Sequence, residues 1–224
     1  MKKSYLLLVA SLLLSFTAQA AVHVCTPAAN SLAWCLTQAD TLVLTDGVYE
    51  EAYTIKFEKP GIVLRAAEGA KPVIRLTGEW TTLGLYATTT FDGITFDGTN
   101  VCYYPISAYG SDAGTYTFKN CEFTGWMYWA ISNHYESNTH VDNVLIENCI
   151  FHDAAGSAIY FNDDAPTGEH ACANFEMKNS TLYNLVEDEY VGVIHVSSRS
   201  EATGAQNKVV IDHITMYDCT TPQL

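Results

Sequence analysis

Four segments of this 224-residue chain share a short pattern that ends in residues able to do chemistry. They read YPIS at residues 104–107, WAIS at 129–132, SAIY at 157–160 and GVIH at 192–195. Successive side chains of a β-strand point to opposite faces, so each isoleucine would point inward and the next residue outward. The outward positions, together with those two residues further on, are Ser107, Ser132, Tyr160, His195, Tyr109, His134, Asn162 and Ser197.

Aromatic rings, hydroxyls and amides on one face are suited to sugars. Rings stack on the apolar faces of sugars, and the polar groups bond to sugar hydroxyls. We therefore predict a substrate-binding strip made of Tyr109, His134, Tyr160 and Asn162. An ordinary solvent-facing surface of a repeat protein would give the same pattern, and this alternative stays open.

Two smaller groups of residues could add reactivity to the strip. Arg199 follows His195 by four residues, and the two are candidate catalytic residues that could serve as base and charge clamp. Asp163 and Asp164 directly follow Asn162 and could bind Ca²⁺ through their carboxylates. Solvated carboxylates in a loop are the alternative to such a metal site.

An internal repeat predicts the elements that would position these residues. Five six-residue segments share one pattern, FDGITF at 91–96, FKNCEF at 118–123, IENCIF at 146–151, MKNSTL at 177–182 and IDHITM at 211–216. Their spacing of 27 to 34 residues, with short β-like runs and no helical period, is typical of a β-solenoid. Gly, Asn or His at the third position suits a left-handed bend between two sheets.

The same pattern predicts the core. The sixth positions would form one buried column of Phe96, Phe123, Phe151, Leu182 and Met216. The fourth positions would form another, of Ile94, Cys121, Cys149, Ser180 and Ile214. Cys121 and Cys149 are then small core residues and not catalytic ones. We also expect a short helix within residues 32–38 to cover the open end of the core, where Cys25 and Cys35 are close enough in sequence to form a staple.

The first 20 residues have the layout of a secretory signal peptide. Lys2 and Lys3 precede an apolar run that is too short to span a membrane, and an A-x-A site ends at Ala20. We therefore expect residues 21–224 to form one β-helix domain that can continue past residue 224, in the periplasm, at the cell surface or outside the cell. Without the leader, the chain has nine basic and 25 acidic residues, which gives a formal charge of −16. Such a surface is a poor partner for nucleic acid.

Residues 41–59, which contain LVLTDGVYEE, and residues 64–74 resemble the opening coils of secreted pectin-lyase-like right-handed parallel β-helix proteins. Within that superfamily the chain most resembles the chondroitinase B and alginate lyase group and related uncharacterised β-helix proteins of Bacteroidetes. The resemblance implies β-elimination of a uronate-containing polysaccharide, with a Lys base, a neighbouring Arg and Ca²⁺. This sequence departs from that pattern, because no Lys falls on the sheet that carries the strip.

These features lead to two expectations about function. The first is a secreted protein that binds uronate-containing polysaccharide, with cleavage by β-elimination left open and Ca²⁺ as the candidate cofactor. The alternative is a non-catalytic glycan-binding or adhesive scaffold. The fold alone does not decide between them, and the oligomeric state is left open.

Overall fold

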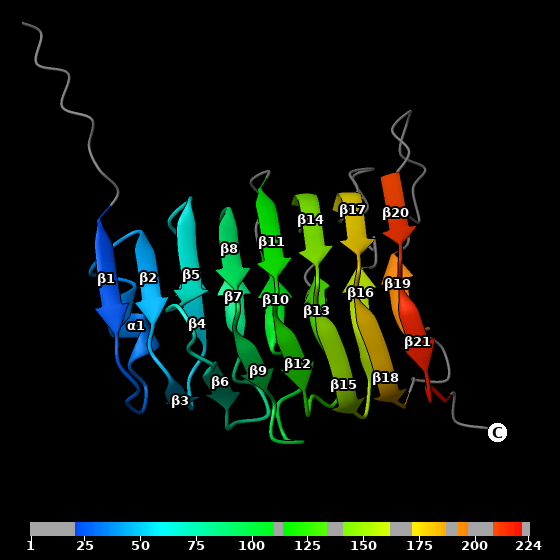
Figure 1. Cartoon of the computed structure of the whole chain (residues 1–224), viewed down its shortest axis with the longest axis horizontal. Coiled ribbons are helices and arrows are strands. Elements are labelled where there is room, and N and C mark those ends of the chain that lie inside the picture. The colour runs from blue at the N-terminus through cyan, green and yellow to red at the C-terminus, as the bar shows by residue number, and fades with distance from the viewer. Residues whose placement is uncertain are drawn as a thin grey trace, which may run out of the picture.

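The chain folds into a right-handed parallel β-helix. The computed structural model describes residues 21–109, 114–133, 141–161, 172–186, 192–196 and 208–220. Within these residues the strands form three sheets, and every pair of neighbouring strands is parallel (Figure 1). Each full coil contributes one strand to each sheet, so the coils stack along the long axis as the repeat predicts.

The first sheet consists of β1 (Val22–Cys25), β2 (Thr41–Leu44), β5 (Ile62–Ala66), β8 (Thr89–Asp92), β11 (Thr115–Lys119), β14 (Val141–Glu147), β17 (Cys172–Lys178) and β20 (Lys208–Asp212). The second sheet consists of β3 (Gly47–Glu51), β6 (Pro72–Leu76), β9 (Thr95–Asp97), β12 (Glu122–Thr124), β15 (Ile150–Ala154), β18 (Thr181–Leu185) and β21 (Thr215–Tyr217). The third sheet consists of β4 (Ile55–Phe57), β7 (Leu83–Leu85), β10 (Ile106–Ala108), β13 (Trp129–Asn133), β16 (Ser157–Phe161) and β19 (Ile194–Val196).

The bend between the first and second sheets has the predicted left-handed backbone. Its φ angles lie between 49° and 73° at Gly93, Asn120, Asn148, Asn179 and His213. Asn148 donates through Nδ2 to Asn120 Oδ1 at 3.3 Å, and Asn120 donates in the same way to Asp92 Oδ1 at 2.7 Å. The asparagines therefore tolerate the bend and also link successive coils.

The predicted core columns are confirmed except at the last coil. Phe96, Phe123, Phe151 and Leu182 are fully buried, and the rings of Phe123 and Phe151 stack with centroids 4.6 Å apart. Met216 is 47% exposed, so its assignment to the buried column is wrong. It lies on β21, the edge strand of the second sheet in the described part of the chain.

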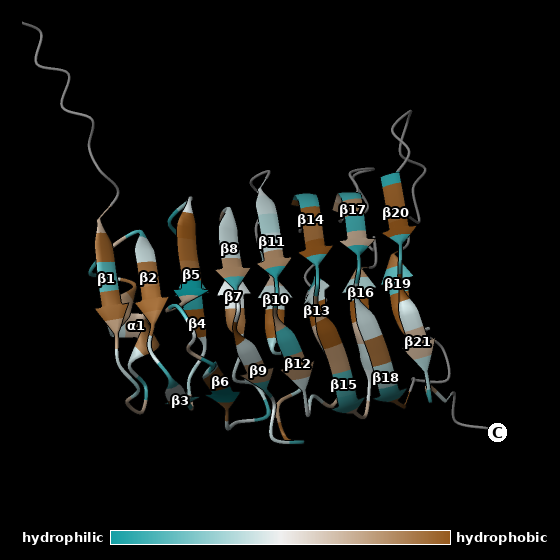
Figure 2. Cartoon of the chain, viewed as in Figure 1, coloured by the Kyte–Doolittle hydropathy of each residue, from teal (hydrophilic) through white to brown (hydrophobic). Residues whose placement is uncertain are grey.

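The second column behaves in the same way. Ile94, Cys121, Cys149 and Ser180 are buried, whereas Ile214 is only partly buried. Burial raises the pKa of the Cys121 thiol well above its usual value, which fits a small core residue and not a nucleophile. Figure 2 shows the apolar bands that recur on the strands along the stack.

A short helix lies at the N-terminal end of the core, as expected. It is α1 (Leu32–Cys35), shorter than the predicted range, and both of its end residues are buried. The buried carboxylate of Glu51 accepts a hydrogen bond from the backbone N–H of Leu32 at 3.0 Å. Burial raises the pKa of Glu51, and hydrogen bonds from the backbone N–H groups of Leu32 and Ser31 at the start of the helix oppose this rise. No helix within the described residues is both long and apolar enough to cross a lipid bilayer.

Candidate functional site

The outward positions of the third sheet are neighbours, as the sequence predicts. Ser107 pairs with Ser132, Ser132 with Tyr160, and Tyr160 with His195 on four successive coils. At the other end, Ser107 pairs with Gly84. The register of the strip is therefore confirmed.

The solvent exposure expected of this strip is wrong. Ser107 and Ser132 are completely buried, and Tyr160 is only 9% exposed. Large rings fill this face: Tyr160 stacks on Trp129 with centroids 3.8 Å apart. Tyr160 therefore lies outside the main core but inside a second buried cluster with Tyr104 and Trp129.

Tyr109 lies at a different place on the same face. Its ring stacks on Tyr86 with centroids 5.2 Å apart, and a Cβ on Gly84 would lie 3.2 Å from atoms of both rings. Lys56 Nζ lies 5.5 Å from the centre of the Tyr86 ring, a cation–π distance. Tyr109 thus covers the Gly84 end of the strip. The positions of Ser107 and Ser132 separate it from Tyr160.

His195 is the one predicted catalytic residue within the described ranges. Its ring is half-buried and stacks on Tyr160 with centroids 5.0 Å apart. Burial lowers the pKa of His195, so the imidazole is neutral at pH 7 and has the protonation state of a general base. The other predicted site residues, Arg199, His134, Asn162, Asp163 and Asp164, lie outside the described residues. The predicted calcium site and the predicted His–Arg pair therefore stay predictions.

The structure adds a feature that the sequence analysis missed, an exposed aromatic row at the bend between the second and third sheets. We define it as Tyr53, Trp80, Tyr103 and Tyr128, one residue from each of four successive turns. Trp80 packs edge-to-face on Tyr103 at 5.0 Å, and Tyr103 does the same on Tyr128 at 4.9 Å. Tyr53 is 72% exposed, Trp80 63% and Tyr128 44%, whereas Tyr103 between Trp80 and Tyr128 is partly buried. Neighbouring exposed aromatic rings are unusual on a protein surface and commonly mark a site that binds a ligand or a partner.

The buried cluster supports this row from below. Tyr104 contacts Trp80 with ring centroids 6.0 Å apart, and Trp129 with centroids 5.2 Å apart. Because Trp129 stacks on Tyr160, ring contacts run without a break from Trp80 to His195. Tyr160 and His195 therefore lie at one end of a longer series of contacting rings, and the exposed Trp80 lies at the other end.

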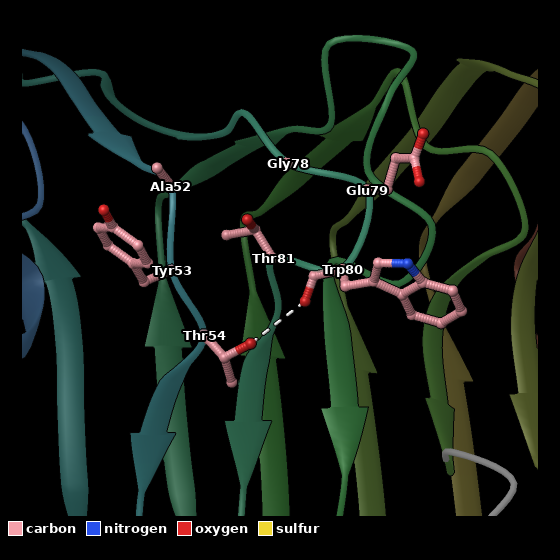
Figure 3. Close-up of a pocket in the computed structure, with 7 residues that line it drawn as sticks. All are labelled: Ala52, Tyr53, Thr54, Gly78, Glu79, Trp80 and Thr81. Carbon is pink, nitrogen blue, oxygen red and sulfur yellow. Dashed lines mark hydrogen bonds between the residues drawn. The ribbon is translucent and has the colours of Figure 1, made fainter.

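A shallow depression of about 480 Å³ lies at the start of the row and is lined by Ala52, Tyr53, Thr54, Gly78, Glu79, Trp80 and Thr81. Figure 3 shows the rings of Tyr53 and Trp80 on opposite sides of the two threonines. Thr54 Oγ1 donates to the backbone oxygen of Trp80 at 3.2 Å, which ties neighbouring turns together. The pKa of Tyr103 is raised by desolvation and by the nearby Glu79, so its phenol keeps its proton. Rings, hydroxyls and a carboxylate are thus gathered around one hollow.

Two lysines on the first sheet, Lys119 and Lys178, are engaged with carboxylates. Lys119 Nζ lies 3.6 Å from Glu147 Oε2, and Lys178 pairs with Glu176. Register places Lys119, Glu147 and Lys178 on adjacent strands, an alternation of charge that favours this stacking. Lys119 and Lys178 act between coils of the first sheet, so they do not supply the base that the resemblance implies. The prediction that no lysine falls on the sheet of the strip is wrong, because Lys56 lies on β4 of the third sheet and pairs in register with Gly84.

His152 on the second sheet contacts carboxylates through both ring nitrogens. Its Nε2 lies 2.8 Å from Glu122 Oε1 and its Nδ1 lies 2.7 Å from Asp153 Oδ2. Both ring nitrogens are therefore engaged with carboxylates. The ring also stacks on Tyr183 of the next coil, so His152 links coils and its contacts are with the protein itself.

Comparison with known proteins agrees with the fold. No protein-family model matches this sequence, and no curated protein matches it. Among solved structures, the PL6 family alginate lyase AlyGC matches with a TM-score of 0.67 and 18% identity over 89% of this chain and 28% of that one. A point mutant of AlyGC matches with a TM-score of 0.63 and 14% identity over 90% of this chain and 37% of that one. The chain thus spans less than two fifths of either solved chain, and it has the parallel β-helix fold of these alginate lyases.

Proposed function

We propose that this protein binds a polysaccharide along the exposed aromatic row. The observation that carries the proposal is the set of exposed rings of Tyr53, Trp80 and Tyr128 on successive turns around the partly buried Tyr103, with the 480 Å³ depression between Tyr53 and Trp80. Aromatic rings offer apolar faces to sugar rings, and the exposed Thr54 and Glu79 offer partners to sugar hydroxyls. Export to the periplasm, the cell surface or the medium would put this surface where polysaccharides are met.

The experiment is affinity electrophoresis in gels that contain one polysaccharide each, uronate-containing or neutral. The wild type is expected to be retarded by at least one polymer. Trp80→Ala should lose most of that retardation, because the indole is the largest exposed ring of the row. Trp34→Ala is a matched control, since Trp34 is 58% exposed but lies on α1 at the end of the core. If Trp80→Ala and the wild type are retarded equally by every polymer, the result contradicts the proposal.

A second candidate function is cleavage of a uronate-containing polysaccharide by β-elimination. The observation that favours it is His195, whose lowered pKa gives a neutral imidazole at the inner end of the ring series. A neutral imidazole can take the proton α to a uronate carboxylate, while a cation neutralises the charge that develops. The predicted cation is Ca²⁺, with Asp163 and Asp164 as its candidate ligands and Arg199 as a candidate charge clamp.

Absorbance of the unsaturated uronide separates the two functions. A lyase gives this absorbance on alginate or another uronate polymer, and His195→Ala abolishes it while retardation in the gel persists. Chelation of Ca²⁺ should abolish the absorbance as well. Retardation without any absorbance from the wild type would leave binding as the function and reject cleavage.

A further inference from the structure

We propose that His23, Cys25 and Cys35 form a zinc-binding site at the N-terminal end of the β-helix. One ring nitrogen and two sulfurs lie within 4.8 Å of one another. They come from two elements, with His23 and Cys25 on β1 and Cys35 at the end of α1. The site lies at the N-terminal end of the stack, between β1 and α1, and does not depend on the function proposed above.

The local structure explains why the three donors meet. His23 and Cys25 are two residues apart on a strand, so their side chains share one face. That face meets α1, where Trp34 packs edge-to-face on the His23 ring at 5.2 Å. The helix itself is held by the bond from Leu32 to the buried Glu51. In a tetrahedral zinc site with ordinary Zn–S and Zn–N bonds the donors are about 3.5–3.8 Å apart, so closure needs a shift of only about 1 Å.

The donor set favours zinc over hard cations. Thiolate and imidazole are soft or borderline ligands, which suit Zn²⁺ and not Ca²⁺ or Mg²⁺. Both cysteines are buried and His23 is half-buried, so the imidazole side is open for a water as fourth ligand. A cysteine thiol must lose its proton to bind zinc, so affinity should rise with pH.

A disulfide between Cys25 and Cys35 is the competing product of the same two thiols. It would leave His23 without a role, whereas a metal site uses all three donors. Cys121 and Cys149 provide an internal comparison, because they are also buried thiols on adjacent coils. Ser180 occupies the same column on the next coil, so a serine is compatible with that position.

The experiment is titration of the full chain with zinc, and with cobalt as a spectroscopic probe, in the presence of a phosphine reductant. We expect one metal per chain and a near-ultraviolet thiolate-to-cobalt absorption. Cys35→Ser should abolish that absorption. His23→Gln should weaken zinc binding by roughly 100-fold or more, since even the loss of an outer-shell partner costs roughly 10–100-fold. Cys149→Ser should bind as the wild type does.

Several results would overturn the zinc site. One is a reduced wild type that binds no zinc, whether or not the unreduced protein carries a Cys25–Cys35 disulfide. Another is cobalt absorption that is lost in Cys149→Ser and kept in Cys35→Ser. If Cys35→Ser does not fold by circular dichroism, His23→Gln still decides the matter, because it leaves the thiols in place: wild-type affinity in that variant contradicts the site.

Discussion

Trp80 and Tyr160 belong to the same series of contacting rings, yet only Trp80 is open to a ligand. Tyr160 is stacked between Trp129 and His195, whereas Trp80 contacts Tyr103 and Tyr104 and is still 63% exposed. A buried ring contributes to stability through its packing, and an exposed one can contribute to binding. Residue type alone therefore does not tell which tyrosines bind sugar.

The burial of Tyr160 gives a prediction about stability. Tyr160→Ala should lower the free energy of unfolding by about 3–5 kcal/mol, as for other buried aromatic residues cut to alanine. Tyr160→Phe keeps the stacked ring and should cost much less. Urea titration followed by circular dichroism measures both. A cost below about 1 kcal/mol for Tyr160→Ala would mean that its ring is not packed as described.

Asp153 gives a prediction about pH. Its pKa is lowered by hydrogen bonds from His152 and Asn184. A carboxyl whose folded-state pKa is depressed stabilises the fold above its ordinary pKa, and this contribution is lost as pH falls through the folded-state value. Asp153→Asn is a suitable variant because asparagine also tolerates the left-handed φ of 51° at this position. When the pH is lowered from about 6 to about 3, we expect the melting temperature of this variant to fall by less than that of the wild type. Identical losses in both proteins would show that the carboxylate makes no such contribution.

At the scale of the elements, each coil depends on its left-handed bend. Asn148 has a φ of 54°, a conformation that costs a residue with a Cβ about 1–2 kcal/mol unless its side chain compensates. Asn148 compensates by its bond to Asn120, which alanine cannot form.

Asn148→Ala should therefore lower the free energy of unfolding by about 1–2 kcal/mol or more. Asn148→Gly should cost less, because glycine adopts the bend freely and already does so at Gly93 of an earlier coil. Guanidinium titration of the two variants tests the order. A glycine variant that is no more stable than the alanine variant would show that the left-handed bend does not set the cost, because both variants lack the side-chain bond.

The elements also explain what could be predicted from the sequence. The six-residue repeat contains both the bend and two inward positions, so strands, register and core columns followed from it. The turns between the second and third sheets vary in length, and the exposed aromatic row in them was missed. A signal was present nonetheless: Trp80, Tyr103 and Tyr128 each lie three residues before the inward Leu83, Ile106 and Ile131.

The exposure of the strip could not be predicted, for a physical reason. Alternation along a strand fixes the face of a side chain but not what lies over that face. Here Tyr86 and Tyr109 lie over Gly84, and Trp129 lies against Tyr160. Such contacts join different coils, so they follow from the stacking and not from any one segment.

At the scale of the whole molecule, the exposed aromatic row follows the axis of the stack. From Tyr53 to Tyr128 it crosses three steps between coils, about 14 Å at the usual spacing of parallel strands. A polysaccharide bound to it would run along the same axis. The chain is acidic, with a formal charge of −14, and Glu79 lies at the row. A uronate polymer would therefore need a bridging cation, whereas a neutral polymer would not.

The most direct test of the row is the dependence of affinity on ligand length. Isothermal titration calorimetry would use oligosaccharides of increasing length from a polymer that retards the protein. Affinity should rise with length until the ligand spans the row and then level off, and Trp80→Ala should remove most of that rise. If the shortest oligosaccharide binds as tightly as the longest, or if Trp80→Ala keeps the wild-type dependence, the polysaccharide does not bind along the exposed aromatic row.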